Sequence, residues 1–200
     1  MIRFKKIKWK NFLSTGDQWT EVKLNDDGTT LIVGANGAGK STVLDAICFV
    51  LFNKPYRKIT KSQLVNTTNE KGTETEIEFE IGSKQYLVRR GIKPNIFDIE
   101  IDGNMRNKEA DDRVNQKVLE EQILKLNFKS FTQIVILGSS NFIPFMQLNG
   151  PNRREVIEDL LDIKIFSAMN NIVRDKLRVV KDSVRTLELK KDNLHDKVRM

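Results

Sequence analysis

The 200-residue sequence predicts an α/β fold with a strand–loop–helix unit, an antiparallel β-meander and a long outgoing helix. A glycine-rich run between an apolar pentapeptide and an apolar helix pattern predicts the first part. Segments that alternate apolar and polar residues with period two predict the meander. A heptad of apolar residues near the end predicts the outgoing helix. We therefore expect a globular lobe over residues 1–150 and the start of a helical arm over 151–200.

The glycine-rich run Gly34–Ser41 has the full G-x-x-x-x-G-K-[ST] pattern of a phosphate loop. Thr29–Val33 precedes it as a predicted buried strand, and Thr42–Phe52 follows as a predicted helix. Its glycines let the backbone turn tightly, so that amide groups point at an anion beside a helix N-terminus. The pattern and both flanks therefore predict a nucleoside triphosphate site.

Two side chains of this run are expected to carry its chemistry. Lys40 is predicted to reach the β and γ phosphates, and it is the candidate catalytic residue. The Ser41 hydroxyl is predicted to bind the Mg²⁺ ion that bridges those phosphates. A purely structural glycine-rich turn is the alternative, which the match at every fixed position disfavours.

Composition favours an acidic partner, because the net charge is +7 and the pI is about 9.4. Nucleic acid is the obvious candidate, although a merely solvated basic surface explains the composition equally well. The single cysteine, Cys48, excludes an intramolecular disulfide and is expected to pack in the core. With no signal-peptide core and no membrane-length apolar run, a cytoplasmic protein is expected.

The chain is expected to open with a small sheet. Phe4–Lys10 interleaves strand-forming residues with lysines, and Trp19–Leu24 alternates again after a turn. We expect Phe4–Lys10 to be an edge strand with solvated lysines, which is favoured over a strand that contacts nucleic acid.

The meander is predicted over residues 74–81, 85–90 and 96–101. Four glutamates share one face of its first strand, and these are Glu74, Glu76, Glu78 and Glu80. They suggest either a metal-binding row or a solvated face. The solvated face is favoured, because neither histidine nor a second carboxylate cluster accompanies them.

Helical spacing predicts a helix over 111–126, and a cap at 149–155 starts another. The heptad then occupies Val173, Leu177, Val180, Val184, Leu187, Leu194 and Val198. A helix with such a stripe needs a partner helix, as in a coiled coil. An amphipathic helix lying on the domain is the alternative, but a period of 3.5 drifts off a straight core face.

A phosphate-loop ATPase also needs an acidic residue at the end of a second buried strand. No apolar run in a strand context ends in Asp or Glu, since Val156–Asp159 lies in a helical segment. The sequence therefore corresponds to half of an ATPase, and we expect the chain by itself not to hydrolyse ATP.

Several further segments carry a family resemblance together with Gly34–Thr42. They are Lys10–Ser14, Leu51–Arg57, Arg89–Asn95, Ser130–Gly138, Pro144–Met146, Arg153–Arg154 and Glu158–Leu161. With them the chain resembles the SbcC-type ATPases of the structural-maintenance-of-chromosomes (SMC) class, and most closely the large subunits of phage recombination endonucleases. The resemblance runs through nearly the whole chain.

This resemblance implies the N-terminal half of an ABC-type ATPase head, joined to its other half through a long antiparallel coiled coil. It also implies ATP and Mg²⁺ as cofactors, an SbcD-type nuclease subunit and double-stranded DNA ends as partners, and a head dimer with a second copy. In a phage protein the location would be the host cytoplasm. An SMC or RecN-like chromosome-organising ATPase without a nuclease is the alternative.

By the same resemblance, the triphosphate is bound by Asn36, Gly37, Ala38, Gly39, Lys40, Ser41 and Thr42. The residues Lys61, Ser62 and Gln63 match a segment near the nucleotide in relatives. The chain departs from the family pattern at Leu13, where relatives often have Arg, and at Ser139–Asn141, where many have Gln-Gly-Gln. Asn141, or Ser139 by position, is expected to contact Mg²⁺ in preference to Gln133. Apolar residues outside the heptad, Ile163, Ile165, Phe166 and Met169, predict that the nuclease binds at the root of the arm; their packing against the ATPase lobe is the alternative.

Overall fold

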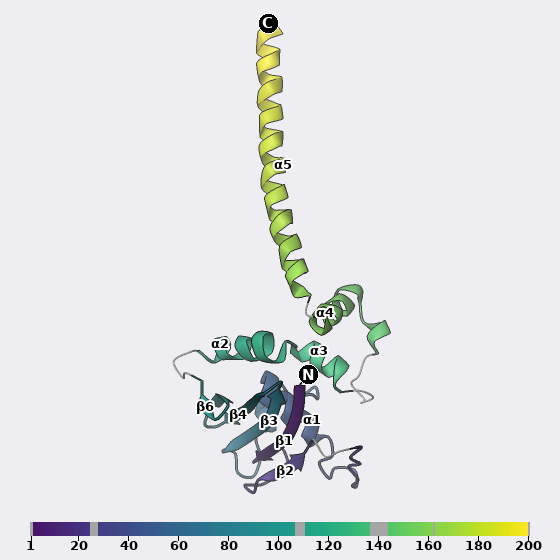
Figure 1. The fold of residues 1–200 in the computed structure, drawn as a ribbon, viewed down its shortest axis with the longest axis vertical. Helices are drawn as coiled ribbons and strands as arrows, with labels where there is room; N and C mark the ends of the chain where they lie inside the picture. Colours follow the sequence, from purple (N-terminus) through teal and green to yellow (C-terminus); the bar gives the residue numbers. More distant parts are fainter. Residues whose placement is uncertain (1, 25–27, 107–110, 137–143, 162, 200) are drawn as a thin grey trace. The chain divides into compact units, whose positions relative to one another are not determined.

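The computed structural model describes residues 2–24, 28–106, 111–136, 144–161 and 163–199. The chain separates into two compact units, Met1–Arg153 and Arg154–Met200. The first unit contains the phosphate loop and the sheet, and the second contains the long helix (Figure 1).

An antiparallel six-stranded sheet with the order β2-β1-β3-β4-β5-β6 forms the frame of the first unit (Figure 1). Its strands are β1 Ile2–Lys10, β2 Thr20–Lys23, β3 Thr73–Ile81, β4 Lys84–Ile92, β5 Ile96–Ile101 and β6 Asn104–Met105. Short turns with left-handed glycines, Gly82 at φ 63° and Gly103 at φ 78°, join β3 to β4 and β5 to β6. The predicted antiparallel meander is confirmed.

Strand β1 is not the edge strand that its lysines suggested, because it lies between β2 and β3. Its core face explains the position: Ile7 lies opposite Val22 of β2 and Ile77 of β3. Phe4 and Ile7 also break the alternation by one residue, and the pairing with β3 shifts register between Phe4 and Lys6. This irregularity lets apolar residues on both sides of it face the core.

The glutamate row of β3 is neither a metal site nor a purely solvated face. Each carboxylate forms an ion pair with a lysine of β1, in the pairs Lys5–Glu80 (3.0 Å), Lys6–Glu78 (2.9 Å), Lys8–Glu76 (2.6 Å) and Lys10–Glu74 (3.1 Å). Glu80 lies opposite Arg3 in the strand register and also pairs with it at 3.1 Å. Within the described residues, no group of three or more His, Cys, Asp or Glu could hold a metal ion. The charge pattern therefore sets strand pairing.

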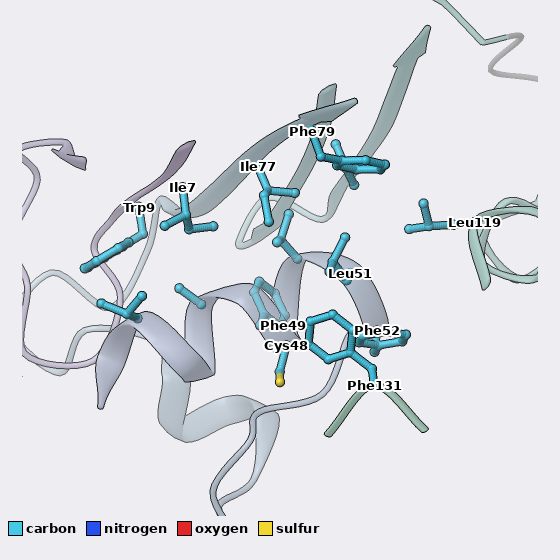
Figure 2. Packing of buried hydrophobic residues seen from close by; sticks show 14 of the residues in the cluster. Ile7, Trp9, Cys48, Phe49, Leu51, Phe52, Ile77, Phe79, Leu119 and Phe131 are labelled. Atoms are coloured by element: carbon cyan, nitrogen blue, oxygen red, sulfur yellow. The ribbon is translucent and has the colours of Figure 1, made fainter. Parts of the chain in front are cut away.

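Helix α1, Thr42–Phe52, packs its apolar residues against the sheet and forms the core. Figure 2 shows Phe49 and Leu51 of this helix near Ile7 and Ile77 of the strands. Cys48 is fully buried, and its burial raises the pKa of the thiol, as expected for a packing residue. The helix ends at Asn53, which adopts φ 58° and donates its backbone N–H to the Phe49 carbonyl at 2.8 Å.

The segment Thr29–Val33 does not form the buried strand that its composition predicted. It has no strand geometry, and the side chains of Leu31 and Val33 are 83% and 80% exposed. A strand needs a neighbouring backbone for its N–H and C=O groups, and no described strand lies beside this segment. The prediction was wrong because apolar composition alone does not supply that neighbour.

The helices other than α1 and the long C-terminal helix are short. They are the 3₁₀ helix η1 Lys61–Leu64, α2 Asp112–Lys117, the π-helix η2 Val118–Leu124, α3 Phe128–Ile134, the 3₁₀ helix η3 Phe145–Gln147 and α4 Gly150–Leu160. The helix predicted over 111–126 is therefore present, with π geometry in its second half. Helix α4 includes Val156–Asp159, which confirms that this acidic run is not a strand end.

The second unit is dominated by α5, Lys164–Arg199, an uninterrupted helix of 36 residues (Figure 1). All seven heptad residues on it are exposed, from 47% at Val184 to 85% at Val198. The predicted long helix is confirmed, and its apolar seam is exposed. No helix in the described part of the chain is long and apolar enough to cross a membrane.

Candidate nucleotide-binding site

The phosphate loop has the backbone geometry that an anion site requires. Gly37 at φ 87° and Gly39 at φ 91° adopt left-handed conformations that suit glycine. Among the described residues, the amides of Gly37, Gly39, Lys40 and Ser41 donate to no protein acceptor. These donors lie directly before the N-terminus of α1, where the helix dipole also favours an anion.

Lys40 lies over this loop. Its ammonium donates hydrogen bonds to the Gly34 and Ala35 carbonyls, both at 2.7 Å. The loop thus holds the lysine charge beside its own free amides. This arrangement supplies both the point charge and the dipoles that stabilise a polyphosphate.

A cavity of about 550 Å³ opens beside the loop. Its lining residues are Leu13, Ser14, Asn36, Gly37, Gly39, Lys40, Ser41, Thr42, Arg57, Gln63, Val65 and Thr67. Most of the predicted binding residues are thus brought together, and Ala38, Lys61 and Ser62 are not among those that line it. The volume lies within the range of small-molecule sites.

Lys61 and Ser62 make other contacts on η1. The Lys61 ammonium lies 5.8 Å from the centre of the Phe49 ring, and burial together with the nearby Arg90 charge lowers the pKa of Lys61. The Ser62 hydroxyl lies 3.0 Å from that of Thr60. Neither side chain lines the cavity, and their role near the nucleotide remains a prediction.

Gln63 does line the cavity, and a local hydrogen bond fixes it. Its side-chain oxygen accepts the Thr60 backbone N–H at 2.8 Å, in a capping box at the start of η1. Backbone bonds join the next residues to the first turn of the chain, with the Leu13 N–H donating to the Leu64 carbonyl at 2.7 Å. The side-chain amide of Asn66 donates to the Leu13 carbonyl at 3.0 Å. Two segments that are distant in the sequence thus line the cavity together with the loop.

Sequence reasoning missed one charged residue of the cavity, Arg57. It follows the end of α1 and is paired with Asp45, a carboxylate with no exposed surface on that helix. The signal was present in the sequence, since Asp45 is the only acidic residue in an otherwise apolar helix. A buried carboxylate predicts a cationic partner nearby.

The proposed magnesium contact Asn141 and the alternative Ser139 lie outside the described residues, so both remain predictions. Gln133 is described and lies on α3. Its side-chain oxygen is buried with no hydrogen-bond partner in the described part of the chain, and it does not line the cavity. The ranking of Gln133 below Asn141 as a magnesium contact remains a prediction.

The donor set fits a nucleoside triphosphate with Mg²⁺. Free loop amides and the Lys40 ammonium suit phosphate oxygens, and the Ser41 hydroxyl, which lines the same cavity, is a suitable oxygen ligand for Mg²⁺. The fold and this site define the class of the chain as a phosphate-loop nucleotide-binding lobe.

The chain belongs to the AAA domain family, which matches residues 6–198. It is 37% identical to exonuclease subunit 2 of Escherichia phage RB69 over 198 residues, which cover 99% of this chain and 35% of the relative. Against exonuclease subunit 2 of Enterobacteria phage T4, identity is 40% over 85% of this chain and 30% of the relative. It is also 29% identical to the DNA double-strand break repair Rad50 ATPase of Sulfolobus acidocaldarius, over 95% of this chain and 21% of the relative.

These similarities confirm the resemblance to SbcC-type ATPases. The chain spans about a third of the length of the phage relatives. The fold matches the Smc head domain with an extended coiled coil from Pyrococcus furiosus, with a TM-score of 0.57 and 22% identity over 94% of this chain and 49% of that one. A structure from a study of ATP-driven dimerisation of SMC ATPases matches with a TM-score of 0.54 and 22% identity, over 79% of this chain and 99% of that one. The predicted fold of an SMC-type head lobe with an outgoing helix is confirmed.

Proposed function

We propose that this chain is the ATP-binding first lobe of an ATPase in a DNA repair or recombination nuclease complex. ATP binding would close two heads on each other, and their opening and closing would control access of DNA to the partner nuclease. The observation that carries the proposal is the phosphate loop with its free amides and Lys40 beside a cavity of about 550 Å³.

In the assembled site, the loop amides and Lys40 would hold the phosphates, and Ser41 would hold Mg²⁺. Bound Mg²⁺ supplies charge neutralisation at the β and γ phosphates. Asn36 and Thr42 line the same cavity and would contact the triphosphate, and Gln63 also lines it. In the described part of the chain, no acidic residue ends a buried parallel strand, so the residues that complete hydrolysis are expected elsewhere in the protein.

Two exposed apolar features support a divided head. Leu31 and Val33 lie directly before the phosphate loop at 83% and 80% exposure, where further strands could cover them. The seam of α5 calls for a returning helix. The relatives named as exonuclease subunits are about three times as long as the matched region, and their remaining length could supply both partners.

The nuclease partner would bind the root of the arm. Ile165, Phe166 and Met169 are 62%, 65% and 54% exposed there, and they add apolar surface outside the heptad seam. Polar substitution at Phe166 is expected to reduce co-purification of the nuclease subunit. Undiminished co-purification would place the nuclease elsewhere.

Lys40→Ala in the full-length protein tests the proposal. We expect loss of ATP hydrolysis and of ATP-dependent head dimerisation, measured by phosphate release and by light scattering. Lys58→Ala is a matched control, because Lys58 is an exposed lysine that does not line the cavity. Wild-type turnover in Lys40→Ala would refute the proposal. The 200-residue chain alone is expected to show no turnover above background.

An SMC-like chromosome-organising ATPase is the second candidate, favoured by the match to the Smc head fold. Its head chemistry would be the same, but no nuclease would be present. Affinity purification of the full-length protein from its own host distinguishes the two, since recovery of a nuclease subunit supports the first and its absence the second.

A further inference from the structure

A buried ion pair links the helix that follows the phosphate loop to the wall of the cavity. Asp45 lies on α1, four residues after Ser41, and its side chain has no exposed surface. Its partner Arg57 lies twelve residues later in the chain and lines the nucleotide cavity with Ser41 and Thr42.

Both oxygens of the Asp45 carboxylate bind Arg57. One oxygen accepts the Arg57 backbone N–H at 3.0 Å, and the other accepts the side-chain Nε–H at 2.6 Å and lies 2.6 Å from Nη2. A carboxylate removed from water is costly unless charge-assisted bonds satisfy it, as these do. The contacts hold both the backbone and the guanidinium of Arg57 in one place.

The Arg57 guanidinium keeps donors available. Its side chain is 43% exposed, and Nη1 has no partner among the described residues. Since Arg57 lines the cavity that also receives the loop amides, the free edge of its guanidinium can donate to a phosphate oxygen there.

We propose that Asp45 is a positioning residue that fixes the Arg57 guanidinium in the nucleotide cavity, so that its free edge contacts the bound triphosphate. The proposal rests on the proposed function, because it presumes a triphosphate in this cavity. It adds that nucleotide affinity depends on a residue that cannot itself reach the ligand.

Asp45→Asn, Arg57→Gln and the double variant in the full-length protein test it. The asparagine keeps the shape of Asp45, but it removes the negative charge and replaces one acceptor oxygen by an NH₂ group, which cannot accept a hydrogen bond from Arg57. We expect each single variant to weaken Mg²⁺-ATP binding about tenfold, as for loss of a charge-assisted contact, and the double variant to bind no more weakly than Arg57→Gln. The measurement is fluorescence titration with a labelled ATP analogue, together with the melting temperature.

Glu76→Gln is the matched control. Glu76 is also a buried carboxylate that is paired with an arginine, Arg89. Unlike Arg57, however, Arg89 does not line the cavity. Glu76→Gln should lower the melting temperature without changing nucleotide affinity. If Asp45→Asn lowers only the melting temperature, or weakens binding equally in the Arg57→Gln background, the positioning role is wrong. If the wild type binds no ATP, the proposed function itself fails.

Discussion

Helices α1 and α5 show how differently apolar residues behave when the chain does or does not provide their partners. In α1, nine of its eleven residues are buried, and the helix lies against the sheet. In α5, the seven heptad residues are between 47% and 85% exposed. The apolar residues of α1 are buried in the core, whereas the apolar seam of α5 is exposed and needs another helix to cover it.

The difference does not lie in helix formation, since both segments are helical. At 1.5 Å per residue, α5 is about 54 Å long, and the residues of its seam are exposed. A short apolar helix is stabilised by the sheet beneath it, while a long amphipathic one gains most of its stability when its seam is buried. The lobe is therefore expected to fold as a unit, and the arm to depend on a partner helix.

The sharpest test of this contrast compares one buried and one exposed phenylalanine. Phe49→Ala on α1 should destabilise the lobe by about 3–5 kcal/mol, because it removes a fully buried ring and leaves a cavity. Urea unfolding of the 200-residue chain measures it. Phe166→Ala on α5, where the ring is 65% exposed, should change the free energy of unfolding by less than about 0.5 kcal/mol. Equal effects would contradict the comparison.

The ion pairs of the sheet extend the contrast to charged residues. Glu76 is 4% exposed and bonded to both Lys8 and Arg89, so Glu76→Gln should cost about 1–3 kcal/mol. Glu78→Gln is the control on the same strand, since its carboxylate is 34% exposed and should contribute at most about 1 kcal/mol. Chemical denaturation of both variants gives the difference, and a larger loss at Glu78 would show that burial does not govern the ladder.

A charge placed in the α5 seam should leave the lobe unaffected. Leu177→Asp is expected to alter the free energy of unfolding of the lobe by less than about 0.5 kcal/mol, because Leu177 is 49% exposed in this chain. In the full-length protein the same substitution should lower the melting temperature of the arm, followed by circular dichroism. Lys176→Asp, on the neighbouring polar position, should not. A lobe destabilised by Leu177→Asp would indicate that the seam packs on the lobe.

The smallest expected effect is a pH dependence at the end of the ladder. The hydrogen bond from Lys5 lowers the pKa of Glu80 from its ordinary value of 4.5, with Arg3 adding to the effect. The pair therefore stabilises the fold above pH 4.5 and loses that contribution as the pH falls through the lowered pKa. Between about pH 5 and pH 3, Glu80→Gln should lose slightly less stability than the wild type. An identical pH profile in both would mean that Glu80 does not contribute.

Local patterns predicted much of this molecule. Period two identified β3, β4 and β5, the phosphate-loop pattern identified Gly34–Ser41, and the heptad identified α5. The failures were non-local: β1 was placed at an edge, and Thr29–Val33 was expected to be a buried strand. A strand's place in a sheet depends on which other strands reach it, and its own residues do not record that.

The candidate site likewise has a part that local sequence patterns predicted and a part that depended on the tertiary structure. The phosphate loop, Lys40 and Ser41 were evident from the sequence, because spacing alone encodes a local turn before a helix. The rest of the cavity lining was decided by folding, which brings Arg57 and Gln63 to the loop and leaves Ala38, Lys61 and Ser62 out of the lining. The sequence by itself thus determined the donors that we propose bind phosphate, since backbone geometry and helix dipole are local properties. Only the tertiary structure placed Arg57 beside the loop, because the buried Asp45 carboxylate holds the segment that follows α1 against this helix.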